Sequence, residues 1–216
     1  RRLMKQSATP MFPLESVLLP DEDLPLRIFE PRYSQLIADC LAGDPVFGVV
    51  LIAAGREVGG GDDRYNVGTL ARIVEHQSHG DGRYTVRCRI GQRLRISRWL
   101  PDDPYPRAIV EPWPDEPGDV VTDAAIGELE DRLMGLFERL ANARGAQLPP
   151  RDMLFGGVAM AEGPGESLYA LASRVPMGQA DRYAVLSAPS AADRLRALSE
   201  AVETVAAMIH FQLSGD

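Results

Sequence analysis

The chain has 216 residues and a formal net charge of −8 at pH 7, and 45% of its residues are hydrophobic. This length and composition predict a globular protein with room for one large domain or two small ones. The sequence contains no apolar run near the roughly 18 residues that a transmembrane helix needs. Its basic start, RRLMKQSATPMF, lacks the apolar segment of a secretory signal, so neither membrane insertion nor secretion is predicted.

Charge is spread unevenly along the chain. Residues 1–110 contain 15 basic and 14 acidic side chains, whereas residues 111–216 contain 8 and 17. Contacts between basic side chains and phosphates dominate nucleic-acid affinity. The acidic second half therefore speaks against general nucleic-acid binding, although a local basic patch in the first half is compatible with this balance.

Cys40 and Cys88 are the two cysteines of the chain. Two isolated cysteines in a chain of this length form neither a disulfide framework nor a C-x-x-C metal motif. We therefore expect both thiols to be reduced and buried, as in a cytoplasmic protein.

The first half of the chain has the pattern of β-strands with one early helix. Residues 12–20 and 24–29 are short apolar runs, and residues 46–54 form an unbroken apolar run of strand length. Residues 31–43 show helical spacing, with Pro31 suited to the first turn and Gly43 to the end. Beyond a glycine-rich loop, four further strands are predicted at 67–77, 83–90, 92–100 and 105–113.

The second half is predicted to be helical after a linker rich in Pro and Asp at 111–119. An apolar stripe predicts a long amphipathic helix at 121–145, and a loop at 146–165 follows it. Further helical segments are predicted at 166–175, 178–187 and 190–213, the last of them capped by Ser190. We therefore predict an α+β protein with a curved β domain at 11–115 and an α-helical bundle at 120–213.

Motifs that carry catalysis or bind cofactors are absent from the sequence. The VGGGDD segment at 58–63 lacks the Gly-Lys-Ser/Thr of a phosphate-binding loop, and Lys5 is the one lysine available for a Ser–Lys dyad. His76 and His79 have H-x-x-H spacing, but the sequence suggests no third zinc ligand, so we interpret them as solvated loop residues. We predict no catalytic residue, no cofactor and no metal site.

A run of alternating arginines stands out in the first half. Arg87, Arg89, Arg93 and Arg95 occupy odd positions, which share one face of a continuous strand. Such a stripe could bind RNA or an acidic partner segment. We favour a solvated sheet face that pairs with the acidic helical half, because no aromatic residue is interleaved on the same face. Gly91 could also introduce a bulge that divides the stripe.

The stretch FPLESVLLPDEDLPLRIFEPRYSQLIADCL, which begins at Phe12, resembles the start of the N-terminal, substrate-binding domain of Lon-type ATP-dependent proteases. The motif positions are Phe12, Pro13, Leu14, Pro20, Pro25, Leu26, Ile28, Phe29, Glu30, Pro31, Arg32 and Tyr33. The resemblance continues through FGVVLI, VGTLARI, DGRYTVRCRIGQRLRI and PYPRAIVEP and covers residues 11 to 213.

The resemblance implies a curved β pseudobarrel, similar to PUA-like domains, joined to an α-helical bundle. It also implies a non-enzymatic protein-interaction module, which recognises unfolded or tagged protein segments and serves a separate ATPase or protease. The chain looks like a stand-alone domain of this kind, or a fragment of one. The alternative is an RNA-binding PUA-like protein that uses the arginine stripe, an argument that rests on fold analogy.

Within this family, the Phe29-Glu30-Pro31-Arg32-Tyr33 cluster is interpreted as a structural corner. We expect the preceding strand to deliver Ile28 and Phe29 to the core, and Pro31 to start the helix. Glu30 lies beside the helix N-terminus, where a negative charge suits the helix dipole. Arg32 is expected to bridge a carboxylate or a carbonyl across the corner.

The client-binding surface is predicted in the loop RDMLFGGVAM, near the junction of the two domains. Its large apolar residues are Met153, Leu154, Phe155 and Met160. Loops normally run over the surface, and methionines adapt to varied partners, so this segment suits a promiscuous binding site. The alternative is that the loop folds back and fills a gap between the domains.

Overall fold

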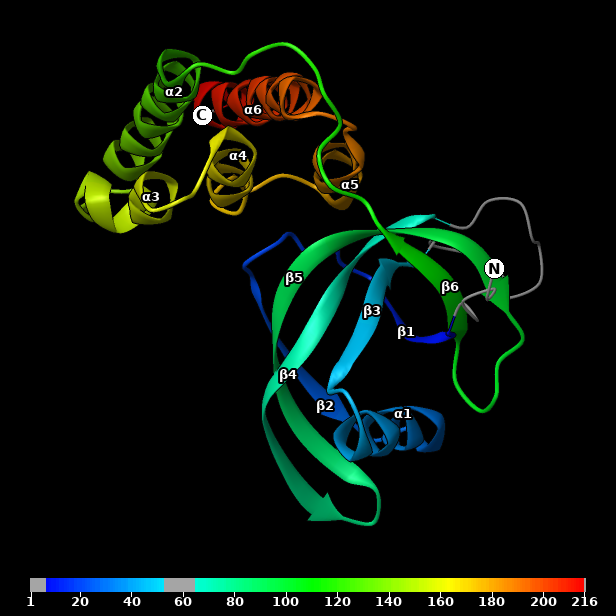
Figure 1. The fold of residues 1–216 in the computed structure, drawn as a ribbon. Helices are drawn as coiled ribbons and strands as arrows, with labels where there is room; N and C mark the ends of the chain where they lie inside the picture. The colour runs from blue at the N-terminus through cyan, green and yellow to red at the C-terminus, as the bar shows by residue number, and fades with distance from the viewer. Residues whose placement is uncertain (1–6, 53–64, 216) are drawn as a thin grey trace. The chain divides into compact units, whose positions relative to one another are not determined.

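The computed structural model describes residues 7–52 and 65–215, which form two compact units (Figure 1). The β unit extends to Pro114 and the helical unit begins at Asp115. Lys5 and the VGGGDD segment lie outside the described residues. Among the described residues, no helix combines the length and the apolar character needed to cross a membrane.

In its described residues, the β unit contains a six-stranded sheet and one helix, α1, at Pro31–Ala42. Its strands are β1 (Thr9–Leu14), β2 (Asp23–Ile28), β3 (Val46–Leu51), β4 (Val67–Gly80), β5 (Arg83–Leu100) and β6 (Arg107–Pro112). The strands predicted separately at 83–90 and 92–100 are one continuous strand, β5. The division predicted at Gly91 is therefore a bulge within the strand: two steps along β4, from Thr69 to Ala71, face three steps along β5.

The sheet closes on itself because β5 pairs with three strands. The strand order is β2-β5-β4-β3-β1-β6, and a further pairing of β5 with β6 completes a ring. β1 and β3 are parallel, and the other pairs are antiparallel. The first half of β5 pairs with β2, and the second half, from Leu94 to Leu100, pairs with β6. This arrangement is the α+β curved sheet that the sequence predicts.

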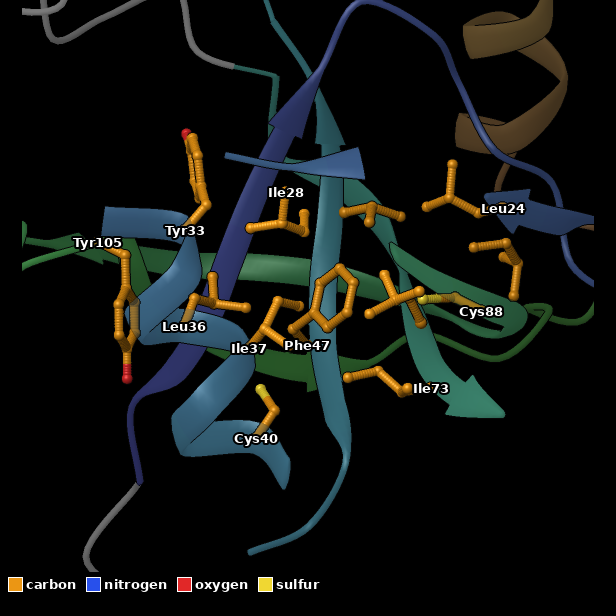
Figure 2. Close-up of a cluster of buried hydrophobic side chains, with 14 residues drawn as sticks. Leu24, Ile28, Tyr33, Leu36, Ile37, Cys40, Phe47, Ile73, Cys88 and Tyr105 are labelled. Atoms are coloured by element: carbon orange, nitrogen blue, oxygen red, sulfur yellow. The ribbon is translucent and has the colours of Figure 1, made fainter. Parts of the chain in front are cut away.

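Helix α1 covers one side of the sheet and fills the core of the β unit (Figure 2). Its buried residues are Tyr33, Leu36, Ile37 and Cys40, as the helical spacing predicts. They pack in one cluster with Phe47 from β3, Ile73 from β4 and Cys88 from β5. Removal of this apolar surface from water is the main stabilising contribution in the unit.

Both cysteines lie in this cluster as free, buried thiols, as predicted. Burial raises the pKa of the Cys40 thiol to about 11 and that of the Cys88 thiol to about 12. The thiolate is the reactive form of cysteine, so both residues are unreactive while the β unit stays folded.

The helical unit consists of α2 (Asp123–Ala143), α3 (Arg151–Ala159), α4 (Pro164–Ala172), α5 (Gln179–Ser187) and α6 (Ala191–Ser214). The predicted stripe on the long helix is buried: Ile126, Leu129, Leu133 and Leu136. Ser190 caps α6 as predicted, because its hydroxyl oxygen accepts a hydrogen bond from the Asp193 N–H at 3.1 Å. This bond satisfies one of the amide groups that a helix start leaves unpaired.

A buried arginine fastens the start of the helical unit to its last helix. Arg194 on α6 is fully buried and donates two hydrogen bonds to the Asp115 carboxylate, at 3.0 and 2.5 Å. Its guanidinium also lies 3.8 Å from the centre of the Tyr169 ring on α4. Asp115, within the linker that the sequence predicts, is thereby held against the helices.

Gly68 on β4 provides a test of how closely the ring is packed. A Cβ atom at Gly68 would lie 2.2 Å from the carbonyl oxygen of Val49, which is a backbone atom and cannot rotate away. We predict that Gly68→Ala destabilises the β unit by about 2 kcal/mol or more. The measurement is urea unfolding followed by thiol labelling of Cys40 and Cys88.

Gly127 on α2 is the matched control, since a Cβ there meets no atom within 4 Å. Gly127→Ala should stabilise the helical unit by about 0.5–1 kcal/mol, because alanine has the higher helix propensity. If Cys40 and Cys88 are as well protected from labelling in the Gly68→Ala protein as in the unmodified chain, the close approach of Gly68 to Val49 is contradicted.

Candidate functional site

The Glu30–Tyr33 corner joins β2 to α1 in the way the sequence predicts for most of its residues. Pro31 is the first helical residue, and the Glu30 carbonyl accepts hydrogen bonds from the N–H groups of Tyr33 (3.0 Å) and Ser34 (2.9 Å). Tyr33 is buried and stacks on Phe12 of β1, with ring centres 4.2 Å apart. The corner therefore positions α1 on the core.

Phe29 corrects the sequence prediction for this corner. Its side chain is 71% exposed, whereas the neighbouring Ile28 is buried. Successive residues of a strand point to opposite faces, so a strand that delivers Ile28 to the core directs the next side chain away from it.

The charged residues of the corner pair with each other at the surface. Arg32 donates to the Glu30 carboxylate at 3.3 Å, and its guanidinium lies 4.7 Å from the centre of the Tyr33 ring. Both charged side chains are about half exposed. Burial raises the pKa of the Tyr33 hydroxyl, which keeps it protonated. The geometry is that of a local surface pair and supplies no activated acid or base.

Arg87 and Arg89, the first half of the arginine stripe, are paired within the sheet. Arg87 makes a bidentate contact with Glu75 on β4, with distances of 3.1 and 3.0 Å. Asp23 on β2 accepts from Arg89 at 3.3 Å and from Arg87 at 3.5 Å. The partners are acidic residues of neighbouring strands and not those of the helical half, so the predicted pairing of these arginines with the helical half is wrong.

Arg93 and Arg95 lie beyond the bulge and share a different partner. Their guanidinium groups lie 3.8 and 3.9 Å from the centre of the Trp113 ring. Arg93 is buried and donates to the Trp113 carbonyl at 2.9 Å. The bulge that Gly91 was expected to introduce therefore separates the four arginines into two groups, and the structure brings no continuous basic face together.

The segment predicted as an apolar loop is largely helix α3, at Arg151–Ala159. Pro150 precedes the helix with extended backbone angles, so the helix begins directly after the proline pair, where the sequence suggested a loop. Phe155 is 97% buried and stacks on Phe137 of α2, with ring centres 6.1 Å apart. This aromatic contact anchors the helix to α2, together with the ion pairs of Arg151 with Glu130 and Asp131.

The two methionines of this segment are displayed on the surface. Met153 is 69% exposed and Met160 is 86% exposed, whereas Leu154 is half-buried. Of the four predicted client-binding residues, therefore, Met153 and Met160 are accessible, and Phe155 is a core residue that supports them.

Sequence reasoning missed further exposed apolar residues. Met208 and Phe211 lie on α6, and Val74 lies on β4. The sequence places both α6 residues in one apolar helical segment, although Phe211, two residues after the buried Ile209, falls outside the buried stripe and helical spacing could have indicated its exposure. Val74 is the extra residue of a bulge, which becomes visible only when the strand register is known.

His76 and His79 both lie on β4 and not in a loop. The His79 Nε2 atom is 2.6 Å from the Thr85 hydroxyl on β5. Within the described residues, no group of three or more His, Cys, Asp or Glu side chains is placed to hold a metal ion.

Comparisons with known proteins agree on one family. The model of the ATP-dependent protease La (LON) substrate-binding domain matches residues 8–204. Lon protease 2 of Thermus thermophilus is 27% identical over 97% of this chain, and Lon protease 1 of Herpetosiphon aurantiacus is 27% identical over 87% of it. The chain spans about a quarter of the length of these relatives, 26% and 23% respectively.

Solved structures show the same relationship. A Lon N-terminal domain protein from Xanthomonas campestris has a TM-score of 0.61 and 26% sequence identity, with 90% of this chain and 98% of that chain covered. The N-terminal domain of a Mycobacterium avium complex Lon protease has the same TM-score at 17% identity, and it covers 91% of this chain and 98% of its own. The second likeness is one of fold.

Arg32→Ala should lower the free energy of unfolding by less than about 1 kcal/mol, because the pair with Glu30 is exposed. Tyr33→Ala, one residue away, should cost about 3 kcal/mol, since it empties a buried aromatic position. Urea unfolding of both variants measures the difference. A larger cost for Arg32→Ala than for Tyr33→Ala would show that the corner depends on its charges.

Phe155→Ala should destabilise the helical unit by about 3 kcal/mol, because the ring is buried against Phe137. Met153→Ala, two residues away on the same helix, should change stability by less than about 0.5 kcal/mol. Circular dichroism during urea unfolding checks both values. Equal effects of the two substitutions would mean that Phe155 does not anchor α3.

Proposed function

This chain belongs to the Lon substrate-binding domain family, and we propose that it acts as a protein-interaction module without enzymatic activity. In this role it binds unfolded or tagged segments of other proteins and supplies recognition for a proteolytic process. The match of the family model over residues 8–204 carries the proposal. An ATP-dependent protease would act on the bound client, as the description of the matched family and the names of the related Lon proteases suggest.

The exposed methionines of the α3 segment support binding of varied apolar sequences. Met153 and Met160 present flexible, polarisable side chains that adapt to different partners. Gly156 and Gly157 lie between them and carry no side chain that would obstruct a bound segment. The backbone departs from helical angles at Phe155, so α3 consists of two short helical pieces that meet at this residue. The buried Phe155 ring holds the junction in place. We define Met153 and Met160 as the methionine site.

The absence of enzymatic activity in the proposal is supported by the state of the polar groups. The two thiols carry raised pKa values and stay protonated in the core. Burial and a hydrogen bond to Asp39 raise the pKa of the Tyr105 hydroxyl to about 12, so it donates a hydrogen bond and does not act as a base.

RNA binding, the alternative function, receives no support from the arginine geometry. Arg87 and Arg89 are neutralised by Glu75 and Asp23, and Arg93 is buried against Trp113. A phosphate at Arg87 or Arg89 would have to displace acidic partners on adjacent strands, and Arg95 is exposed but lies apart from these two, over the Trp113 ring. The contacts favour a structural role for these arginines, in which they connect neighbouring strands of the sheet.

We predict that the double substitution Met153→Ser and Met160→Ser weakens binding of an unfolded client at least tenfold. The probe is reduced, carboxymethylated lactalbumin, and fluorescence anisotropy gives the dissociation constant. The reason is that the contact area of each methionine contributes about 1 kcal/mol or more when it is buried, and about 1.4 kcal/mol corresponds to a factor of ten.

Met208→Ser is the matched control, because Met208 is also exposed and lies in the same unit on α6. It should leave client affinity within about twofold. Binding that is unaffected by the double substitution would place the client elsewhere. Binding that weakens steeply with added salt would indicate a polyanion-type interaction and contradict recognition through apolar surface.

A further inference from the structure

The far end of β4 has one side without a partner strand. β3 pairs with β4 from Val46↔Arg72 to Val50↔Gly68, and the last contact on that side is the Ile73 N–H bond to the Pro45 carbonyl, at 2.9 Å. β4 continues to Gly80, paired with β5 on its other side. Among the residues that the structure describes, no strand pairs with β4 on this outer side beyond Ile73.

Residues 75–78 form the regular part of this segment, which we call the open edge. Two register irregularities, at Ile73/Glu75 and Ser78/Gly80, bound it. Between them, four consecutive residues face Arg87, Val86, Thr85 and Tyr84 of β5 in unbroken register. The length of the open edge therefore corresponds to a partner strand of about four residues.

The open edge carries backbone groups that the sheet leaves unused. In an antiparallel pair, alternate residues direct their N–H and C=O groups toward the neighbouring strand or away from it. β5 uses the groups on one side only, so the others point outward. All four residues are exposed. In Figure 1, α1 lies on the β5 side of this hairpin and leaves the outer side of β4 clear.

β2 forms the opposite edge of the three-stranded segment β2-β5-β4, and a proline protects it. Pro25 has no N–H group to offer to a further strand. Proline is one of the devices by which sheet edges resist pairing with other chains.

The open edge lacks this protection. Its sequence, Glu75-His76-Gln77-Ser78, contains no proline and no lysine. The bidentate contact with Arg87 holds the Glu75 carboxylate on the sheet face and lowers its pKa. Val74, immediately before the edge, is 45% exposed and adds an apolar contact.

We propose that the open edge binds an extended segment of a client polypeptide as an additional strand of the sheet. The site would read the backbone of the client and not its side chains, since outward N–H and C=O groups match those of any extended chain. A folded protein has already paired these groups, whereas an unfolded segment offers them. The inference rests on the proposed function and assigns it a second site, separate from the methionine site.

The direct test uses an extended heptapeptide of alternating valine and threonine. N-methylation of alternate residues leaves one edge of the peptide able to pair and prevents its self-association. In the unmodified protein labelled with ¹⁵N, this peptide should shift the amide signals of residues 74–79 and slow hydrogen exchange of the outward amides at 75–78. A peptide with the same side chains and every amide methylated should do neither.

Adjacent proline substitutions identify the edge. Because the N–H groups of neighbouring residues point to opposite sides, one of His76→Pro and Gln77→Pro removes an outward donor and the other an inward one. The outward variant should keep its melting temperature and bind the heptapeptide about tenfold more weakly. The inward variant should have a lower melting temperature, because it loses a hydrogen bond to β5. The two variants together then separate an effect on binding from an effect on stability.

The outcomes distinguish this inference from the proposed function. If carboxymethylated lactalbumin and the heptapeptide bind both folded proline variants as tightly as they bind the unmodified protein, the proposal for the open edge is wrong. The methionine site is then unaffected. An unmodified protein that binds neither probe would overturn both proposals. Self-association that disappears in the outward variant would assign the edge to a second copy of this chain and overturn its role with clients.

Discussion

The β unit depends on a single constraint: β5 must pair with β2 and β4 along its first half and with β6 along its second half. Its first half lies between β2 and β4, and its second half pairs with β6 and closes the ring. A straight strand of 18 residues could not do both. The extra β5 residue between Ile90 and Arg93 bends the strand at the point where its partners change. The core under α1 exists because the ring closes around it.

The arginines of β5 follow from the same constraint. On one side of the bend, Arg87 and Arg89 connect the strand to acidic residues of β2 and β4. On the other side, Arg93 and Arg95 hold Trp113 at the end of β6. Exposed ion pairs each contribute less than about 1 kcal/mol, so their effect is to favour one register over others more than to stabilise the fold. A basic stripe in sequence is thereby converted into cross-strand connections.

Local patterns predicted most of the elements, and most of what they failed to predict depends on contacts between residues far apart in the chain. Helical spacing and Pro31 gave α1, and the apolar stripe gave α2, because both signals lie within one element. Phe29 was placed in the core although strand alternation excludes it beside Ile28. The glycines and prolines around Phe155 indicated a loop, whereas the contact with Phe137, 18 residues earlier in the chain, holds a helix there. The open edge depends on where β3 ends relative to β4, which no local pattern contains.

The methionine site and the open edge use different chemistry, and together they describe how a client could be selected. A four-residue strand addition is weak and nearly independent of sequence, while methionine contacts favour apolar side chains. Each site by itself would favour an unfolded client, because strand addition needs an unpaired backbone and the methionine contacts need an accessible apolar segment. A folded protein offers neither an unpaired backbone nor a free apolar segment. Selection would therefore depend on the length and apolar content of the unfolded segment, without a requirement for one defined sequence.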